Sequence, residues 1–258
     1  MNIKYVLGAI ISVPLLPILY FQGKKIVRSL PELPEATDIE GVSSAVSNTS
    51  FQLVTIGEST IAGVGASTHE TGFTGTLAKE LSKEISATIS WKVYAKSGYT
   101  VQCVNQKLIP KITEKPVDLI VIGLGGNDSF KLSSPKRWNK DIRALIVSIR
   151  ANYPTTPIVF ANMPPIKEFT AFTGTFKFVI GNLVLHLGKE LEKVVKDYEN
   201  VFYRAKGLEY EDLVARMNLT AKPEEFFSDG VHPSELAYQV WAKDVAQYIL
   251  EEKICHKN

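Results

Sequence analysis

Two segments far apart in the chain carry a possible nucleophile and a possible base. Ser59 follows an apolar run through Gly57, whose missing side chain permits a tight turn that presents the serine hydroxyl. Near the C-terminus, Asp229 stands three positions before His232, in a turn shaped by Gly230. A carboxylate so placed can hold one ring nitrogen of the histidine and leave the other free to take the serine proton. Together these residues can carry out nucleophilic attack on an acyl carbon.

Uncharged hydrogen-bond donors are found in two further segments. Gly98 follows a second apolar run, and Asn127 follows a third, directly before Asp128. The tetrahedral intermediate of acyl transfer carries a negative oxygen, which preorganised N–H groups stabilise. We therefore predict an oxyanion hole formed by the backbone N–H groups of Ser59 and Gly98 and the side-chain amide of Asn127. Asp128 is predicted to be structural.

Simpler roles exist for each of these residues. A serine or an aspartate often caps a turn or a helix, and an Asn-Asp pair often shapes a turn after a strand. The presence of all four segments, in this order, favours the catalytic interpretation. His232 is preferred as the base because the other histidines stand in a loop of small residues, on an apolar helical face and in the C-terminal tail, at His69, His186 and His256.

The sequence has no spacing typical of a cofactor or metal site. The loop with Gly63 and Gly65 lacks the lysine of a phosphate-binding loop, and Thr68 replaces the last small residue of a dinucleotide fingerprint. Neither HExxH nor CxxC spacing occurs. We therefore expect no metal site and neither of these two phosphate-binding loops. With a formal net charge of +2 and no basic block in the folded region, nucleic acid is not an expected partner either.

The residues between the motifs indicate an α/β fold. Short apolar runs, which predict strands, span residues 51–56, 91–95, 119–124, 158–161 and 201–203. Spacers of helical length separate them, with the clearest helical periodicity over residues 136–152, 178–198 and 235–250. This alternation predicts a parallel sheet covered by helices on both sides. Ser59, Gly98 and Asn127 each follow the carboxyl end of a predicted strand, the edge at which such sheets bind ligands.

The N-terminus has the features of a membrane segment. Residues 5–21 carry no charge and reach the lower length limit of a membrane-spanning helix, about 17 residues. Basic residues flank the stretch, and aromatic residues stand at both of its ends. Pro14 and Pro17 are better tolerated in a membrane helix than in a soluble one. Because no signal-peptide cleavage site comes after the stretch, we predict an N-terminal transmembrane or signal-anchor helix.

This prediction divides the chain into three parts. Residues 1–28 are expected to form the membrane anchor or signal with its basic flank, residues 29–50 a linker, and residues 51–258 the catalytic domain. The protein is then expected at a bacterial inner membrane. The basic flank favours a cytoplasmic body, whereas enzymes tethered in this way often face the periplasm, so the side stays open. Secretion after cleavage is the alternative.

The four segments resemble the sequence blocks of the SGNH (GDSL-type) esterase and lipase family. In chain order, the matching blocks are Gly57-Glu58-Ser59, Gly98, Gly125-x-Asn127-Asp128 and Asp229-x-x-His232. The resemblance covers about residues 51–250, and the sequence NMPP at residues 162–165 is similar to a bacterial subgroup of small esterases. Where the family usually has aspartate before the serine, this chain has Glu58.

The resemblance implies a three-layer αβα sandwich around a five-stranded parallel sheet, of flavodoxin-like type, without a cofactor. It implies a catalytic triad of Ser59, His232 and Asp229, and an oxyanion hole of Ser59, Gly98 and Asn127. The expected activity is that of a serine esterase or lipase that hydrolyses carboxylic esters through an acyl-enzyme. A glycan O-deacetylase or an acyltransferase would use the same residues. A binding domain that keeps the fold without catalysis is the remaining alternative.

The segment after the fourth predicted strand is rich in phenylalanine. Phe169, Phe172, Phe176 and Phe178 lie there, and they either wall an acyl pocket or pack in the core. An apolar wall combined with a membrane anchor indicates a small-molecule or lipid-like ester as substrate. The sequence does not indicate an oligomeric state.

Overall fold

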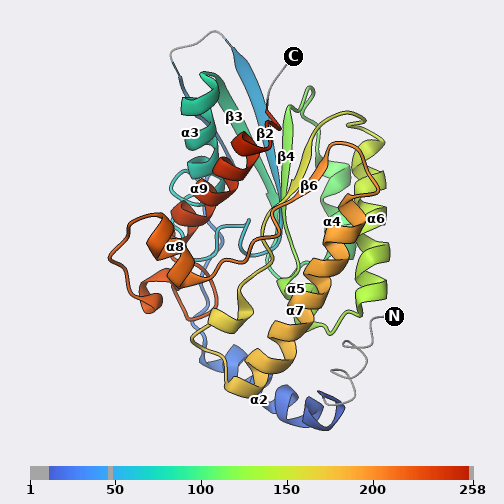
Figure 1. Cartoon of the computed structure of the whole chain (residues 1–258), viewed down its shortest axis with the longest axis vertical. Helices are drawn as coiled ribbons and strands as arrows, with labels where there is room; N and C mark the ends of the chain where they lie inside the picture. The colour runs from blue at the N-terminus through green and yellow to red at the C-terminus, as the bar shows by residue number, and fades with distance from the viewer. Residues whose placement is uncertain (1–11, 46–48, 256–258) are drawn as a thin grey trace.

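A six-stranded sheet runs through the molecule, with helices on both of its faces (Figure 1). The computed structural model describes residues 12–45 and 49–255. In chain order the strands are β1 (Glu40–Ser43), β2 (Ser50–Gly57), β3 (Thr88–Ala95), β4 (Leu119–Gly123), β5 (Ile158–Phe160) and β6 (Val201–Tyr203). Their order across the sheet is β1-β3-β2-β4-β5-β6.

The prediction of a purely parallel, five-stranded sheet is wrong. The five predicted strands are present as β2 to β6 and pair in parallel, but β1 adds an edge strand antiparallel to β3. With the sequence Glu-Gly-Val-Ser, β1 is too short and too polar to be recognised from periodicity. Its pairing depends on tertiary contacts instead. A Cβ at Gly41 would collide with the Trp91 ring, and Lys92 forms an ion pair with Glu40 at 3.1 Å.

Helices cover the sheet in two groups. The helices α3 (Phe73–Ile85) and α9 (Glu235–Glu251) cover one face, and α4 (Val101–Lys107), α6 (Pro135–Arg150) and α7 (Gly174–Val195) cover the other (Figure 1). The shorter helical segments are η1 (Val13–Leu15), α2 (Leu16–Ser29), η2 (Ile109–Lys111), α5 (Gly126–Phe130), η3 (Ile166–Glu168), α8 (Tyr210–Arg216) and η4 (Pro223–Phe226).

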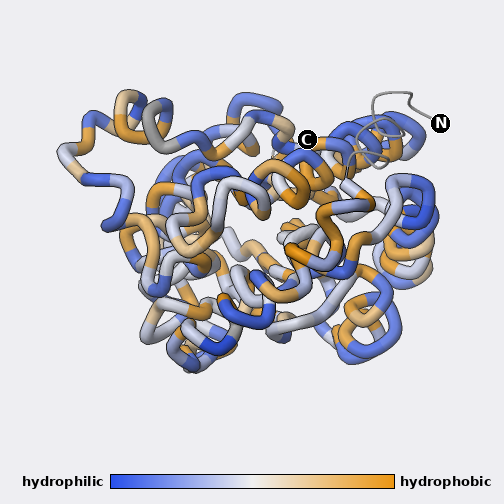
Figure 2. The backbone as a smooth tube through the Cα atoms, turned by 90° about the horizontal axis from the view of Figure 1, so that it is seen from below, coloured by the Kyte–Doolittle hydropathy of each residue, from blue (hydrophilic) through white to orange (hydrophobic). Residues whose placement is uncertain are grey.

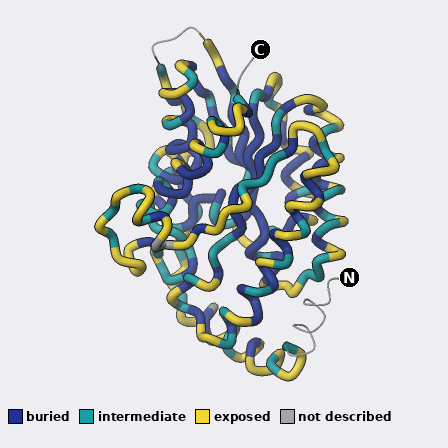
Figure 3. Tube along the Cα trace, in the orientation of Figure 1, coloured by how far each residue is buried: buried dark blue, intermediate teal, exposed yellow. Residues whose placement is uncertain are grey.

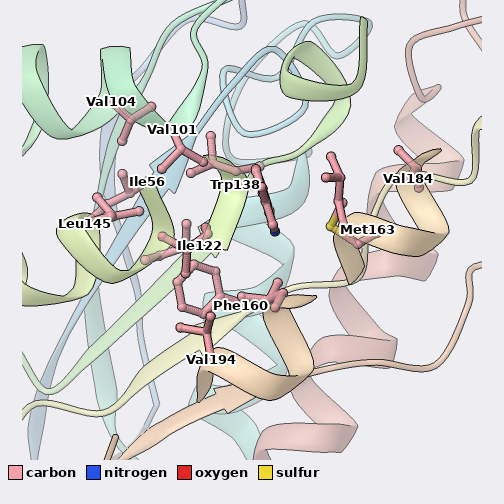
Figure 4. Close-up of a cluster of buried hydrophobic side chains, with 14 of the residues drawn as sticks. Ile56, Val101, Val104, Ile122, Trp138, Leu145, Phe160, Met163, Val184 and Val194 are labelled. Atoms are coloured by element: carbon pink, nitrogen blue, oxygen red, sulfur yellow. The ribbon is translucent and has the colours of Figure 1, made fainter. Parts of the chain in front are cut away.

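Alternate residues of the central strands enter different cores. Val54 and Ile56 of β2 pack with the residues of α4, α6 and α7, whereas Leu53 packs with those of α3 and α9. Figure 4 shows part of the first core, in which Ile56 and Ile122 meet Trp138. Because both faces are covered, the central strands such as β2 and β4 are among the most deeply buried parts of the chain, while the helices keep hydrophilic residues outside (Figures 2 and 3).

The helices α6 and α9 begin at side-chain caps that hold their first turns. Ser134 accepts a hydrogen bond from the Arg137 N–H at the start of α6, and Ser234 accepts one from the Ala237 N–H at the start of α9. Ser234 thus fixes the start of α9 directly after the segment that holds Asp229 and His232.

The predicted membrane-spanning helix is contradicted by the structure. Residues 5–11 of the apolar stretch lie outside the described residues, and the remainder of the stretch forms the short turn η1 and then the start of α2, which has 14 residues. Pro14 and Pro17 stand at the second positions of these two segments and so divide the apolar run. Over residues 12–45 and 49–255, the chain has no helix with the length and apolar character needed to cross a membrane.

The helix α2 packs against the rest of the protein. It lies at the lower end of the molecule in Figure 1, next to the beginning of α7. Leu19 and Ile26 are buried in the same core as α7, and the Thr173 hydroxyl donates to the Gln22 side chain at 2.7 Å. The inner-membrane location that was predicted from an N-terminal anchor is therefore withdrawn.

Candidate active site

The predicted site residues follow three neighbouring strands of the sheet. Ser59 follows β2, Gly98 follows β3 and Asn127 follows β4. Because β2 lies between β3 and β4, the direction of chain progress across the sheet reverses at β2. The carboxyl ends of strands at such a point form a crevice in doubly wound sheets. The topology thus brings these three residues to one edge.

The turn that carries Ser59 is packed tightly on the end of β4. The Glu58 N–H donates to the Gly123 carbonyl at 3.2 Å, and the Ala62 N–H donates back to the Glu58 carbonyl at 2.8 Å. A Cβ at Gly57 would collide with the same Gly123 oxygen. Glycine is therefore required at position 57 for the close approach of two backbones, as its place before the serine indicated.

Asp229 and His232 form a hydrogen-bonded pair on one turn. Asp229 Oδ2 lies 2.7 Å from His232 Nδ1, and Asp229 Oδ1 accepts the N–H groups of His232 and Val231 at 2.7 and 2.9 Å. Burial acts to raise the pKa of Asp229, but the hydrogen bonds from His232 outweigh it and leave the pKa below its ordinary value. The carboxylate is thus ionised at neutral pH and holds Nδ1, so that Nε2 is left for proton transfer.

The turn of Ser59 and the turn of His232 are connected by hydrogen bonds. The Ser228 hydroxyl donates to the Gly65 carbonyl at 3.1 Å, and the Tyr238 hydroxyl of α9 donates to the Val64 carbonyl at 2.8 Å. The Val64 N–H in turn donates to the Ser59 carbonyl at 3.1 Å. Segments separated by more than half of the chain are therefore held side by side.

A largely apolar cavity of about 60 Å³ lies beside both turns. Residues that flank Ser59 and His232 line it, namely Glu58, Thr60, Val231 and Pro233. Its outer walls include Phe169, Leu213 and Phe226. The sequence did not single out Leu213 or Phe226, because each enters the cavity from a distant element whose place depends on the tertiary fold.

Asn127 is hydrogen-bonded to the loop that carries Gly98. Asn127 Nδ2 donates to the Tyr99 carbonyl at 3.2 Å, next to Gly98 in the chain. Gly98 has φ +78°, a conformation that other residues adopt only with strain, and open space surrounds the position of its missing Cβ. Glycine is thus required at position 98 because of the backbone conformation, and not because a side chain would collide with a neighbouring residue.

Two buried carboxylates stand among these residues. Glu58 accepts hydrogen bonds from α5, and Asp128 accepts the Val101 N–H of α4. Burial raises the pKa of Glu58 to about 7 and that of Asp128 to about 6, although backbone hydrogen bonds oppose the change in both. The sequence analysis gave Glu58 no role and noted only that it replaces the usual aspartate of the related family. This replacement was the sequence feature that could have drawn attention to Glu58.

The other residues singled out from the sequence lie in packed parts of the fold or at the surface, with one exception. His69 is buried beneath Gly63, and burial lowers its pKa to about 4. Phe172 and Phe176 pack with Phe130 in an aromatic cluster, whereas Phe178 is 51% exposed. For these four phenylalanines the sequence left a pocket wall and core packing open, and Phe169 lines the cavity. His256 lies outside the described residues. Over residues 12–45 and 49–255, no group of three His, Cys, Asp or Glu residues is placed to hold a metal ion.

Solved structures with the same fold include several esterases. A member of the lipolytic G-D-S-L family from Veillonella parvula has a TM-score of 0.56 at 15% identity and covers 78% of this chain and 98% of its own. A family 3 carbohydrate esterase from Clostridium thermocellum has a TM-score of 0.57 at 15% identity, over 79% and 97%. The aryl esterase of M. smegmatis has a TM-score of 0.54 at 14% identity, over 78% and 99%. No curated protein matches the sequence.

The sequence itself matches a family model over most of its length. The model is that of the GDSL-like lipase/acylhydrolase family, and it matches residues 55–240, which include Ser59, Gly98, Asn127, Asp229 and His232. This match covers well over half of the chain, and the fold agrees with it. The chain therefore belongs to the GDSL-like lipase/acylhydrolase family and is a hydrolase of ester bonds.

Proposed function

We propose that this protein is a serine esterase that cleaves carboxylic esters through an acyl-enzyme on Ser59. The pairing of Asp229 with His232 at 2.7 Å, on a turn bound to the Ser59 turn, carries the proposal. His232 takes the Ser59 proton as the hydroxyl oxygen attacks the acyl carbon, and Asp229 stabilises the imidazolium that results. The same histidine then returns the proton to the leaving alcohol.

The negative oxygen of the tetrahedral intermediate is stabilised by neutral donors. In this proposal they are the Ser59 and Gly98 backbone N–H groups and the Asn127 amide, because all three belong to segments that follow adjacent strands of the sheet. A water molecule then gives a proton to His232 as it attacks the acyl carbon, and His232 returns that proton to the Ser59 oxygen as the acid leaves. Each step requires only groups of this chain, the substrate and one water molecule.

The size of the cavity beside the two turns favours substrates with a short acyl group. Its volume of about 60 Å³ is small, and its walls are mainly apolar. Pockets for drug-sized ligands measure roughly 300 Å³ or more, so a long acyl chain does not fit within this cavity. We infer that acetyl to butyryl esters are the preferred substrates.

The small cavity also favours a second candidate within the same chemistry. The structural neighbour from Clostridium thermocellum is named a family 3 carbohydrate esterase. An acetyl group on a glycan would fill the cavity while the sugar remained outside it. Release of acetate from acetylated oligosaccharides, compared with that from simple alkyl acetates, distinguishes this glycan O-deacetylase from a general esterase.

The nucleophile is tested with a fluorophosphonate probe and a nitrophenyl acetate assay. Ser59→Ala should retain its fold, lose labelling, and lose turnover by several orders of magnitude, since the acyl-enzyme has no oxygen on which to form. Ser67→Ala is the matched control, because Ser67 is an exposed serine of the same loop. Labelling or turnover that persists in Ser59→Ala would refute the proposal.

A further inference from the structure

The two buried carboxylates connect the loops that carry the predicted oxyanion-hole donors. Glu58 is 4% exposed and Asp128 is 2% exposed, and the hydrogen bonds that they accept come from backbone N–H groups and the Asn127 amide. Burying an ionisable group without an ion pair is costly, so it is retained only where hydrogen bonds compensate. Both carboxylates accept N–H groups from a neighbouring loop.

Glu58 binds the beginning of α5 with both of its oxygens. Oε1 accepts the Gly126 N–H at 2.7 Å, and Oε2 accepts the Asn127 N–H at 2.8 Å and the Asn127 side-chain amide at 2.5 Å. A Cβ at Gly126 would lie 3.1 Å from Oε1, so glycine leaves room for the carboxylate. Glu58 thereby ties the residue next to Ser59 to Asn127.

The Asn127 amide has both of its hydrogens engaged in this arrangement. An amide nitrogen donates two hydrogen bonds, and here one is directed to Glu58 at 2.5 Å and the other to the Tyr99 carbonyl at 3.2 Å. The bond to the carboxylate oxygen is the shorter and stronger of the two. The hydrogen that faces Tyr99 is therefore the one that an oxyanion can take, while Glu58 keeps the amide in position.

Asp128 makes the corresponding connection to the third loop. Its Oδ2 accepts the Val101 N–H at 3.0 Å, at the first turn of α4. The loop with Gly98 leads directly into α4, whose N-cap is Thr100. The loops after β2, β3 and β4 are thus linked through two carboxylates.

We propose that Glu58 and Asp128 are positioning residues that hold the oxyanion-hole donors in register, with Glu58 orienting the Asn127 amide and Asp128 holding the loop of Gly98. This inference rests on the proposed esterase activity, because it assigns the residues a part in the same site. Neither carboxylate touches the reacting atoms. Their effect on catalysis is exerted through Asn127 and Gly98.

The test compares Glu58→Gln with wild type on paired oxygen and thiono esters. Glutamine keeps the size of the side chain but presents an NH₂ group to the N–H groups of α5. We expect kcat on the oxygen ester to fall by about 10²-fold, the loss typical of one oxyanion-hole donor, with KM changed far less. Sulfur is a poor hydrogen-bond acceptor, so the rate on the thiono ester should fall less. A purely structural role would lower both rates together.

Two further variants complete the experiment. Glu58→Asp keeps the charge and should recover most of the activity that Glu58→Gln loses. Asp118→Asn is the matched control, because Asp118 also accepts a backbone N–H, from Gln52 at 2.8 Å, but at the opposite end of β4. If Glu58→Gln does not fold, Asp128→Asn replaces it in the same comparison.

The outcomes separate this inference from the proposed function. Wild type that shows no turnover dependent on Ser59 would refute the proposed function. Wild type with such turnover, together with unchanged kcat and an unchanged ratio of oxygen-ester to thiono-ester rates in Glu58→Gln, would overturn the positioning role alone. Equal losses on the two esters would also overturn it, because they indicate a general loss of structure.

Discussion

At the scale of single residues, Glu58 makes the stability of the fold depend on pH. Burial raises the pKa of its carboxyl group from 4.5 to about 7. The folded protein therefore holds this proton more tightly than the unfolded chain does. The associated stabilisation is complete below pH 4.5 and is lost as the pH rises through 7, by an amount on the order of 3 kcal/mol.

We expect the free energy of unfolding to fall more steeply between about pH 5 and about pH 8 in wild type than in Glu58→Gln. Urea denaturation at several pH values measures the two slopes. His69 acts in the opposite sense, because its pKa is lowered to about 4 and its contribution is lost as the pH falls below 6.5. Since both proteins contain His69, the difference between them reports on Glu58. Identical slopes would show that the carboxyl group titrates normally.

At the scale of secondary-structure elements, α2 has one side packed against the rest of the protein and another side exposed. One of its sides packs on the catalytic domain through Leu19 and Ile26, and Gly23 faces Phe176. Another side is open, with Ile18 47% exposed. Because Phe176 packs through Phe172 against Phe169, which lines the cavity, α2 supports the surroundings of the site. The division of the chain into anchor, linker and catalytic domain stays a prediction.

Leu19→Ala should lower the free energy of unfolding by about 2 kcal/mol, because it removes a buried side chain and leaves a cavity. Ile18→Ala is the matched control on the same helix and should change it by less than about 0.5 kcal/mol. Chemical denaturation of both variants gives the comparison. Equal effects at the two positions would mean that α2 does not pack on the domain in solution.

At the scale of the whole molecule, the cavity is enclosed by segments from distant parts of the chain. Phe169 follows β5, Leu213 lies in α8, and Phe226 ends η4 shortly before Asp229. These walls close over the turns that follow β2 and precede α9. The size of the acyl group accepted is thus a property of the assembled fold and of no single motif.

Phe169→Ala should shift the preference toward longer acyl chains, because it opens one wall of the cavity. We expect the ratio of kcat/KM for octanoyl over acetyl esters to rise about tenfold, since a few methylene contacts are worth that much. Phe178→Ala is the control, because Phe178 belongs to the same phenylalanine-rich segment but is 51% exposed. A ratio that stays at the wild-type value in Phe169→Ala would place the acyl group elsewhere.

The sequence alone determined the central strands and the order of the site segments along them. Runs such as residues 119–124 are apolar throughout, and only a strand buried on both faces accommodates such a short run, so β4 was predicted to within a residue. The same holds for β6, whose bounds match the prediction. Gly57, Gly98, Asp229 and His232 could also be identified, because turn chemistry and short spacings act locally.

Only the tertiary structure decided the edge strand, the place of α2 and the state of Glu58. The strand β1 forms because Gly41 fits against Trp91, a contact that joins residues remote in sequence. The hydropathy of α2 is a property of its own residues and does not show what they pack against. The sequence therefore could not distinguish a segment that packs on α7 from one that enters a membrane. The pKa of Glu58 depends on burial by several elements at once. Local pattern therefore specifies which residues follow the strands, whereas desolvation and non-local packing decide what surrounds them.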